Sequence, residues 1–306
     1  MKALITGCAG FIGSNLADEL LRTGNDVVGI DCFTDYYPRE IKEKNIASAR
    51  KNKQFTFIEK DILDLDHFPA VDVVYHLAAQ AGVRASWGKS FSIYTRNNIE
   101  ATQRLLEWYK DNPVTKFVYA SSSSVYGDAP LPMHIETRPQ PVSPYGVSKL
   151  AAEHLCYLYW KNFGVPTISL RFFTVYGPRQ RPDMAINKFV TAVMNGDEIT
   201  VFGDGSQTRD FTYVSDIVSG NIRAASHPDS GKVFNLGGGS RISVIDLIKE
   251  IEKNCGRHAR IRFAEPQKGD AADTMADITP TKSELGWKPD VPIQKGIEKY
   301  VAWRKA

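Results

Sequence analysis

The amino-acid sequence predicts an α/β protein, in which a doubly wound parallel sheet carries helices on both faces and a smaller α/β lobe follows. The first observation behind this prediction is the alternation of short apolar runs with segments of helical periodicity, which is typical of parallel sheets. The runs that predict strands are residues 3–5, 27–30, 55–58, 71–77, 117–120 and 167–172. The segments that predict helices are residues 11–22, 98–110 and 147–162.

The second observation is a change of pattern after Phe173. Residues 176–183 are rich in proline and arginine, and the regular alternation ends there. We therefore expect an N-terminal lobe over residues 1–173 and a C-terminal lobe over residues 174–306, with a return to the first lobe around residues 214–226. Ligands of such sheets bind beyond the carboxyl ends of the strands, so functional residues are expected in the loops that follow them.

Composition narrows the classes of function. The chain has 306 residues and a formal net charge of +3, without a run of lysine and arginine, so we expect no nucleic-acid partner. Four widely spaced cysteines (Cys8, Cys32, Cys156 and Cys255) form no CxxC pair, which favours reduced thiols, no metal site and a cytoplasmic protein. Neither a signal peptide after Met1 nor an apolar run long enough to span a bilayer is apparent, so we expect no membrane partner.

A glycine-rich loop follows the first predicted strand. Gly7, Gly10 and Gly13 are spaced as GxxGxxG, and Phe11 and Ile12 begin the helix after it. Such a loop lets the backbone approach a pyrophosphate at a helix N-terminus, where free N–H groups favour anions. A glycine triplet alone is weak evidence, but here it lies between a strand and a helix. It therefore predicts a Rossmann-type dinucleotide site.

The ends of the next strands complete this expected cofactor site. Asp31 closes the second strand and can accept hydrogen bonds from the adenosine ribose, while its charge would repel a 2′-phosphate. Because Cys32 and Phe33 offer no compensating cation, we expect NAD and not NADP. Asp61 and Ile62, after the third strand, are also expected beside the cofactor. The same holds for the small-residue end of the fourth strand, which consists of Leu77, Ala78 and Ala79.

Tyr145 and Lys149 form a YxxxK pair at the start of a predicted helix. A spacing of four residues places both side chains on one helix face. A free tyrosine has a pKa near ~10 and is a poor base at neutral pH, but a neighbouring ammonium favours the phenolate. The pair is therefore a candidate for proton transfer, although YxxxK alone also occurs at ordinary amphipathic helix starts.

Taken together, these motifs resemble the extended short-chain dehydrogenase/reductase family, and in particular its nucleotide-sugar epimerases and dehydratases. The set also includes Asn98 before Ile-Glu-Ala-Thr, and Ser121-Ser122 before Val-Tyr-Gly. The resemblance runs along essentially the whole chain. It implies tightly held NAD with Asn98 at its site, Tyr145 as the base, Lys149 as its electrostatic partner and Ser122 as the hydroxyl that bonds the reacting oxygen.

The resemblance also implies a nucleoside diphosphate site in the C-terminal lobe. Val201 and Phe202 are similar to a uracil-binding segment, and Gln207 and Arg209 lie just after it, where Arg209 is similar to a pyrophosphate-binding arginine. Asp270 would meet the uridine ribose. One departure is Gln267, where many relatives have arginine, although Lys268 could substitute.

The residues after Ser122 distinguish the chemistries of the family. Dehydratases have Asp-Glu there and UDP-glucuronate decarboxylases have a glutamate before the valine, whereas this chain has Ser123 and Ser124. Residues 80–84, 86–89 and 174–184 resemble the UDP-glucuronate 4-epimerase branch. The resemblance implies that Ser123, Ser124 and Arg181 bind the sugar carboxylate, with Arg84 as a weaker candidate. Thr174, where many UDP-glucose epimerases have asparagine, is also expected to contact the substrate. The alternative for the two serines is a polar turn that bonds its own backbone.

We therefore expect an NAD-dependent epimerase that oxidises carbon 4 of UDP-glucuronate, rotates the 4-keto sugar and reduces it to UDP-galacturonate. A UDP-glucose/galactose 4-epimerase is the nearest alternative, followed by a UDP-glucuronate decarboxylase. A sensor that binds NAD on the same fold is the non-enzyme alternative, which the intact Ser122, Tyr145 and Lys149 disfavour. The resemblance also implies a homodimer.

Overall fold

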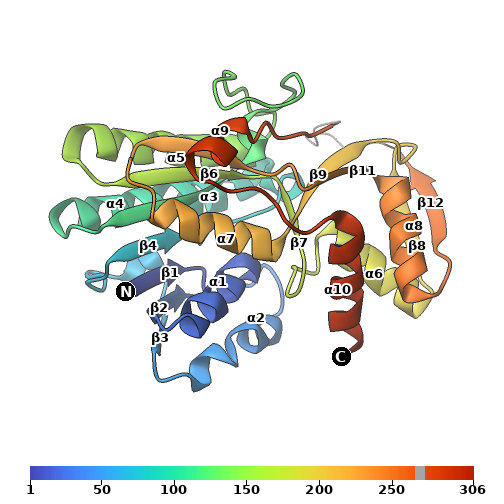
Figure 1. Cartoon of the computed structure of the whole chain (residues 1–306), viewed down its shortest axis with the longest axis horizontal. Coiled ribbons are helices and arrows are strands. Elements are labelled where there is room, and N and C mark those ends of the chain that lie inside the picture. Colours follow the sequence, from blue (N-terminus) through green and yellow to red (C-terminus); the bar gives the residue numbers. More distant parts are fainter. Residues whose placement is uncertain (266–272) are drawn as a thin grey trace.

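The computed structural model describes residues 1–265 and 273–306. Its central feature is a seven-stranded sheet with the strand order β10-β6-β5-β4-β1-β2-β3, in which every strand pair is parallel (Figure 1). Its strands are β1 (Lys2–Thr6), β2 (Asp26–Asp31), β3 (Phe55–Glu59), β4 (Val73–His76), β5 (Lys116–Ser122), β6 (Thr167–Phe172) and β10 (Lys232–Leu236). The order reverses between β1 and β4, which is where doubly wound sheets bind ligands. The predicted α/β fold class is confirmed.

Helices cover both faces of this sheet, and each face has its own apolar core. The helices are α1 (Phe11–Arg22), α2 (Arg39–Ile46), α3 (Phe91–Tyr94), α4 (Ala101–Asp111), α5 (Pro144–Phe163) and α7 (Val214–Ala225). One core contains Leu16 of α1 and Ile217 of α7, whereas the other contains Leu105 of α4 and Cys156 of α5. Because both faces are buried, the strands read as nearly continuous apolar runs.

Two smaller sheets and the remaining helices form a second region, to the right in Figure 1. Its strands are β7 (Thr174–Tyr176), β8 (Glu198–Phe202), β9 (Thr208–Tyr213), β11 (Ser240–Ser243) and β12 (Arg260–Ala264). Its helices are α6 (Ala185–Asn195), α8 (Val244–Cys255) and α10 (Ile293–Lys305), while α9 (Thr279–Glu284) lies nearer to β10. Between β9 and β11, two strands of the three-stranded sheet, the chain returns to the large sheet, where α7 packs on α1 and β10 adds an edge strand. The lobe boundaries at 173 and 214–226 stay a prediction.

Two predicted helices differ from the structure at their starts. The helix predicted over residues 98–110 consists of a π-helical turn (Thr95–Glu100) followed by α4. Such turns often mark functional positions, and this one contains Asn98. Helix α5 begins at Pro144, earlier than the predicted residue 147, because the Ser143 hydroxyl accepts a hydrogen bond from the Gly146 N–H at 3.1 Å and proline suits the first helical position. This cap sets the position of Tyr145 in the first turn.

Candidate active site

A cavity of about 230 Å³ lies where β1, β2, β4 and β5 end, and it contains most of the predicted cofactor residues. Its lining includes Gly7, Gly10, Phe11, Ile12, Gly13, Asp31, Asp61, Ile62, Leu77, Ala78, Ala79, Tyr145 and Lys149. The carboxyl ends of the parallel strands thus bring together residues that are far apart in the sequence, as the fold class predicts.

The glycine loop is packed too tightly for side chains. A Cβ atom on Gly13 would lie 2.2 Å from the Gly7 carbonyl oxygen, and one on Gly7 would lie 2.8 Å from the backbone of Ala78. Gly7 also has a φ of +70°, which favours glycine. At Gly10, by contrast, the nearest atom to an added Cβ would be the Gly7 oxygen at 3.1 Å. The loop therefore presents bare backbone to the cavity at the start of α1, which fits the pyrophosphate of a dinucleotide.

Asp31 is fixed by two backbone donors beside this loop. Its carboxylate accepts hydrogen bonds from the Ala9 N–H at 3.0 Å and from the Phe33 N–H at 2.9 Å. Burial raises the pKa of Asp31, although these hydrogen bonds act in the opposite direction. The fixed acceptor suits ribose hydroxyls. Together with the bare glycine loop, it shows that the residues present fit NAD.

Asp61 lines the cavity, and Asn98 is bonded to Gln80, which also lines it. The Asp61 carboxylate accepts hydrogen bonds from the Leu63 N–H at 2.9 Å and from Arg96 at 3.0 Å. The side chain of Asn98 is buried, accepts a hydrogen bond from the Gln80 N–H at 2.7 Å, and donates to the Gln80 carbonyl at 3.0 Å and to the Ser148 hydroxyl at 2.8 Å. In this structure Asn98 therefore joins the loop after β4 to helix α5.

Ser122 lies close enough to Tyr145 to act on its pKa. Burial raises the pKa of Tyr145, whereas the Ser122 hydroxyl and the charge of Arg181 lower it. The Ser122 hydroxyl accepts a hydrogen bond from the Ser124 N–H at 3.1 Å, which fixes its position at the end of β5. A tyrosine beside a hydroxyl in the wall of a cavity is suited to proton transfer with an alcohol.

Lys149 lies one helical turn after Tyr145 and is buried. Burial lowers the pKa of Lys149 to about 7. Its ammonium lies 4.5 Å from the centre of the Tyr119 ring, a cation–π contact that favours the charged form. Nearby, burial lowers the pKa of His76 to about 3, and its ring is bonded to Thr6 at 2.7 Å and to Thr102 at 2.9 Å. His76 is therefore a neutral structural residue.

The two residues that follow Ser122 line a second cavity. Its lining includes Ser123, Ser124, Thr174 and Arg209, which were all predicted for substrate binding. Among the described residues that line it there is no aspartate or glutamate. Hydroxyl groups together with an arginine suit an anionic ligand.

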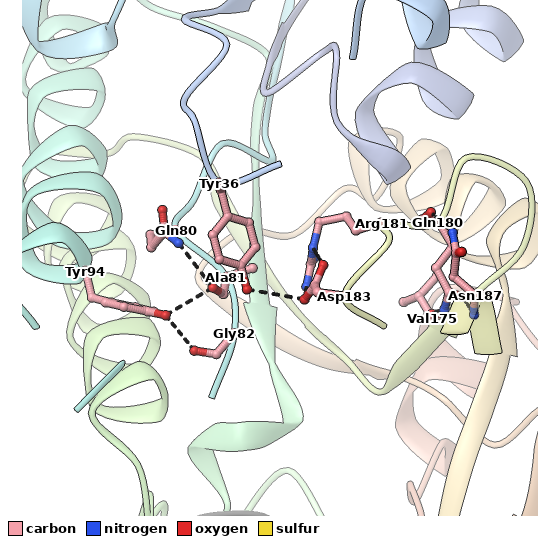
Figure 2. A network of polar contacts seen from close by, with 10 residues as sticks. All are labelled: Tyr36, Gln80, Ala81, Gly82, Tyr94, Val175, Gln180, Arg181, Asp183 and Asn187. Atoms are coloured by element: carbon pink, nitrogen blue, oxygen red, sulfur yellow. Dashed lines mark hydrogen bonds and ion pairs between the residues drawn. The ribbon is translucent and has the colours of Figure 1, made fainter. Parts of the chain in front are cut away.

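Arg181 lies apart from these serines, in the lining of the cofactor cavity. Figure 2 shows its guanidinium held by Asp183, at 2.9 Å and 3.0 Å, and the same carboxylate accepts a hydrogen bond from Tyr36 at 3.2 Å. On the other side, the Tyr94 hydroxyl donates to the Gly82 carbonyl at 2.7 Å. Loops after β2, β4 and β7 therefore converge beside the cavity. The predicted contact of Arg181 with a sugar carboxylate stays a prediction.

The predicted nucleotide residues lie on or near β8. Val201 is buried, and Gln207 donates a hydrogen bond to the Phe202 carbonyl at 2.7 Å. The guanidinium of Arg84 lies 4.7 Å from the centre of the Phe202 ring, so the loop after β4 reaches this strand. The predictions for Asp270, Gln267 and Lys268 fall outside the described residues.

Three residues of the site were missed from the sequence. Lys42 is buried beside the cofactor cavity and donates hydrogen bonds to the Thr34 carbonyl and, at 3.1 Å, to the Thr34 hydroxyl. Tyr36 follows β2 in a loop without a recognisable motif. Ser121 lines the cofactor cavity, but the sequence alone does not distinguish it from the other serines of the run. The sequence feature that could have identified Lys42 is its position one turn into the helix that follows Asp31.

Across residues 1–265 and 273–306, no group of His, Cys, Asp and Glu side chains is arranged to hold a metal ion. In the same residues, none of the helices has the length and apolar character needed to cross a membrane.

Comparison with known proteins agrees with this geometry. A model of the NAD dependent epimerase/dehydratase family matches residues 3–237. A Bacillus subtilis (strain 168) protein, named an uncharacterized UDP-glucose epimerase, is 44% identical over an alignment of 308 residues that covers 99% of this chain and 98% of that protein. A UDP-glucuronate 4-epimerase of Thermodesulfobacterium geofontis (strain OPF15) is 38% identical over an alignment of 310 residues that covers 99% of this chain and 95% of that enzyme.

A solved structure gives the same result. The crystal structure of UDP-glucuronic acid 4-epimerase from Bacillus cereus in complex with UDP-glucuronic acid and NAD has a TM-score of 0.96 and 44% identity. The match covers 100% of this chain and 99% of that chain. Since the family model matches most of the chain and the relatives are similar over nearly its whole length, this chain belongs to the NAD dependent epimerase/dehydratase family.

Proposed function

We propose that this chain is an NAD-dependent 4-epimerase that interconverts UDP-glucuronate and UDP-galacturonate. The observation that carries the proposal is the serine run at the end of β5. Ser121 lines the cofactor cavity, Ser122 lies close enough to Tyr145 to lower its pKa, and Ser123 and Ser124 line the second cavity. One short segment of the chain therefore contributes to both cavities and supplies a hydroxyl beside the tyrosine where a sugar carbon would react.

Tyr145, Ser122 and Lys149 carry the proton chemistry of this proposal. Tyr145 takes the proton from the carbon-4 hydroxyl while Ser122 holds the oxygen, and Lys149 stabilises the phenolate. NAD, when bound, supplies the acceptor and then the donor of the carbon-4 hydride. Rotation of the 4-keto sugar between the two steps presents its other face, and the proton on Tyr145 returns to the oxygen.

The second cavity supports a uronate as the sugar. The hydroxyls of Ser123, Ser124 and Thr174 can donate to a carboxylate, and no described carboxylate in the lining repels it. A 4-keto uronate is a β-keto acid and loses carbon dioxide when the breaking bond aligns with the ketone. Hydrogen bonds that hold the carboxylate out of that alignment therefore protect the 4-keto intermediate until it is reduced.

The test is to incubate the purified protein with UDP-glucuronate and, separately, with UDP-glucose, and to identify the products by NMR. UDP-galacturonate from the first, with little product from the second, is the expected result. UDP-xylose or a 4-keto pentose would contradict it, because the carboxylate would then be unprotected. Tyr145→Phe, run in parallel, should give no product and controls for contaminating enzymes.

UDP-glucose 4-epimerase is the second candidate function. The Bacillus subtilis relative at 44% identity is named for UDP-glucose, and serine hydroxyls can also bond a neutral sugar. UDP-galactose as the main product of the same experiment would favour this candidate.

A homodimer remains part of the proposal. Helix α5 leaves several large apolar side chains exposed, and they are Val147, Tyr157, Leu158 and Phe163. Light scattering on the purified protein distinguishes a dimer, in which these side chains are covered, from a monomer.

A further inference from the structure

Away from the predicted catalytic residues, the chain buries an ion pair between Glu153 of α5 and Arg171 of β6. Both residues are at most 5% exposed. Arg171 donates to the two carboxylate oxygens of Glu153, through Nη2 at 2.6 Å and through Nε at 3.1 Å. The Ser121 hydroxyl donates a third hydrogen bond to this carboxylate, at 2.6 Å. Glu153 is therefore a fully partnered, buried anion.

Stability gives a weak reason to keep such a pair. Removing two charges from water is costly, and buried pairs can often be replaced by apolar side chains of similar volume without loss of stability. Arg171 is further held by the Ile135 carbonyl at 3.3 Å and by the Tyr126 ring, whose centre lies 4.7 Å from its guanidinium carbon. The position of the pair within the fold is more informative than its energy.

The pair contacts both elements that carry the catalytic groups. Glu153 lies four residues after Lys149 on α5, so the two side chains share one helix face. Ser121 directly precedes Ser122 in β5, and the strand register places Ser121 opposite Arg171. The ion pair thus links the lysine helix to the serine strand.

Several groups face Lys149 from the elements around it. Tyr119 comes from β5, His76 from β4, and Tyr145, Glu153 and Cys156 from α5. His76 is neutral, and burial raises the pKa of the Cys156 thiol well above its usual value, so the thiol is neutral as well. Among these described groups, Glu153 alone is an ion-paired carboxylate.

We infer that Glu153 is a positioning residue of the active site, whose carboxylate, fixed by Arg171 and Ser121, is the buried counter-charge that keeps the Lys149 ammonium protonated beside Tyr145. The inference rests on the proposed function in so far as Tyr145 and Lys149 act as the proton-transfer pair. Glu153 acts through Lys149 and needs no contact with the sugar.

The direct test is a pH titration of Lys149 in the free protein. NMR of protein labelled with carbon-13 at its lysine side chains follows the ammonium, and Lys149→Met identifies its signal. The variant Glu153→Gln/Arg171→Met removes both charges and preserves the packing. We expect its Lys149 midpoint at a lower pH than in the wild type. Glu153→Gln alone should move the midpoint further in the same direction, because Arg171 is then an unpaired cation.

Activity provides the second readout. The alkaline limb of the kcat profile should move to lower pH in the double variant, with kcat above neutral pH reduced roughly tenfold per unit of movement. Glu298→Gln, which removes an exposed ion-paired carboxylate of α10 far from the motif residues, should leave the limb in place. Unchanged Lys149 midpoints in folded Glu153 variants would overturn the inference. If the wild type is inactive but the Lys149 midpoint still moves in the Glu153 variants, the proposed function is rejected and the inference about Glu153 stands.

Discussion

The two cavities of this protein are built in different ways. The cofactor cavity is lined mostly by residues at or after the ends of β1, β2 and β4, so its shape follows from the parallel sheet. The polar lining of the second cavity consists of hydroxyls and Arg209, from segments spread between residues 83 and 274. From this comparison we propose a division of work. Residues of the first cavity determine where the chemistry occurs, and residues of the second cavity determine which sugar is bound.

The largest effect is expected at Tyr145, which lines the cofactor cavity. Tyr145→Phe removes the proton-transfer group and should lower kcat by roughly a thousandfold for UDP-glucuronate. The cofactor content of the purified protein should be unchanged, because the glycine loop and Asp31 are intact. Tyr157→Phe, at an exposed position of the same helix, is the matched control. Near-normal turnover in Tyr145→Phe would reject the assignment of the base.

Lys149→Met separates activity from stability in the cofactor cavity. Burial lowers the pKa of Lys149 from 10.5 to about 7, so between these pH values the unfolded chain binds the proton and the folded chain does not. The unfavourable contribution is therefore complete below about pH 7, and stability rises as the pH increases from 7 to 10.5. Lys149→Met should raise the stability of the cofactor-free protein at neutral pH, by on the order of 2 kcal/mol, and flatten this rise.

The same variant should lower kcat by roughly a hundredfold. Thermal unfolding across the pH range and steady-state kinetics measure the two effects, with Lys161→Met as an exposed control on α5. If the variant is less stable than the wild type at neutral pH, then the buried charge of Lys149 does not destabilise the folded protein.

Arg209→Gln tests the second cavity without distinguishing the sugars. If Arg209 binds the pyrophosphate, KM should rise roughly tenfold for UDP-glucuronate and for UDP-glucose alike, with little change in kcat. Isothermal titration with UDP gives the same affinity loss without turnover. Arg22→Gln, at an exposed position of α1, is the control. An effect on only one of the two sugars would move Arg209 from nucleotide binding to sugar selection.

The smallest effect is expected in the loops that converge beside the cofactor cavity. Tyr36→Phe removes one part-exposed hydrogen bond to Asp183, which is worth about 1 kcal/mol or less. We expect NAD to dissociate a few times faster, as measured by stopped-flow fluorescence, with the sugar preference unchanged. A changed sugar preference would show that the two cavities are coupled through Asp183 and Arg181.

The sequence was sufficient for the cofactor half of the site because each contributing residue follows a strand end. Gly7 to Gly13, Asp31 and Leu77 to Ala79 occupy positions that the parallel sheet brings together in any arrangement of its helices. Lys42 and Tyr36 were missed because their positions depend on how the loop after β2 packs, which has no local pattern.

The second cavity was less predictable because it is a product of tertiary packing. Ser123, Ser124, Thr174 and Arg209 were named from a resemblance, and the structure places them in one cavity. Arg181 was predicted to bind the same carboxylate as the serines, yet it lines the cofactor cavity and forms an ion pair with Asp183. The Glu153–Arg171 pair was not anticipated, since neither residue belongs to a motif and the contact depends on the α5–β6 packing.

The most direct test of the division of work is the ratio of kcat/KM for UDP-glucuronate to that for UDP-glucose, in the wild type and in Ser123→Ala/Ser124→Ala. Ser283→Ala, in α9, is the control. If the second cavity selects the sugar, the double variant should lose roughly tenfold with UDP-glucuronate and little with UDP-glucose, so the ratio falls. Equal losses with both sugars, or an unchanged ratio, would contradict the account and leave the two serines as a polar turn.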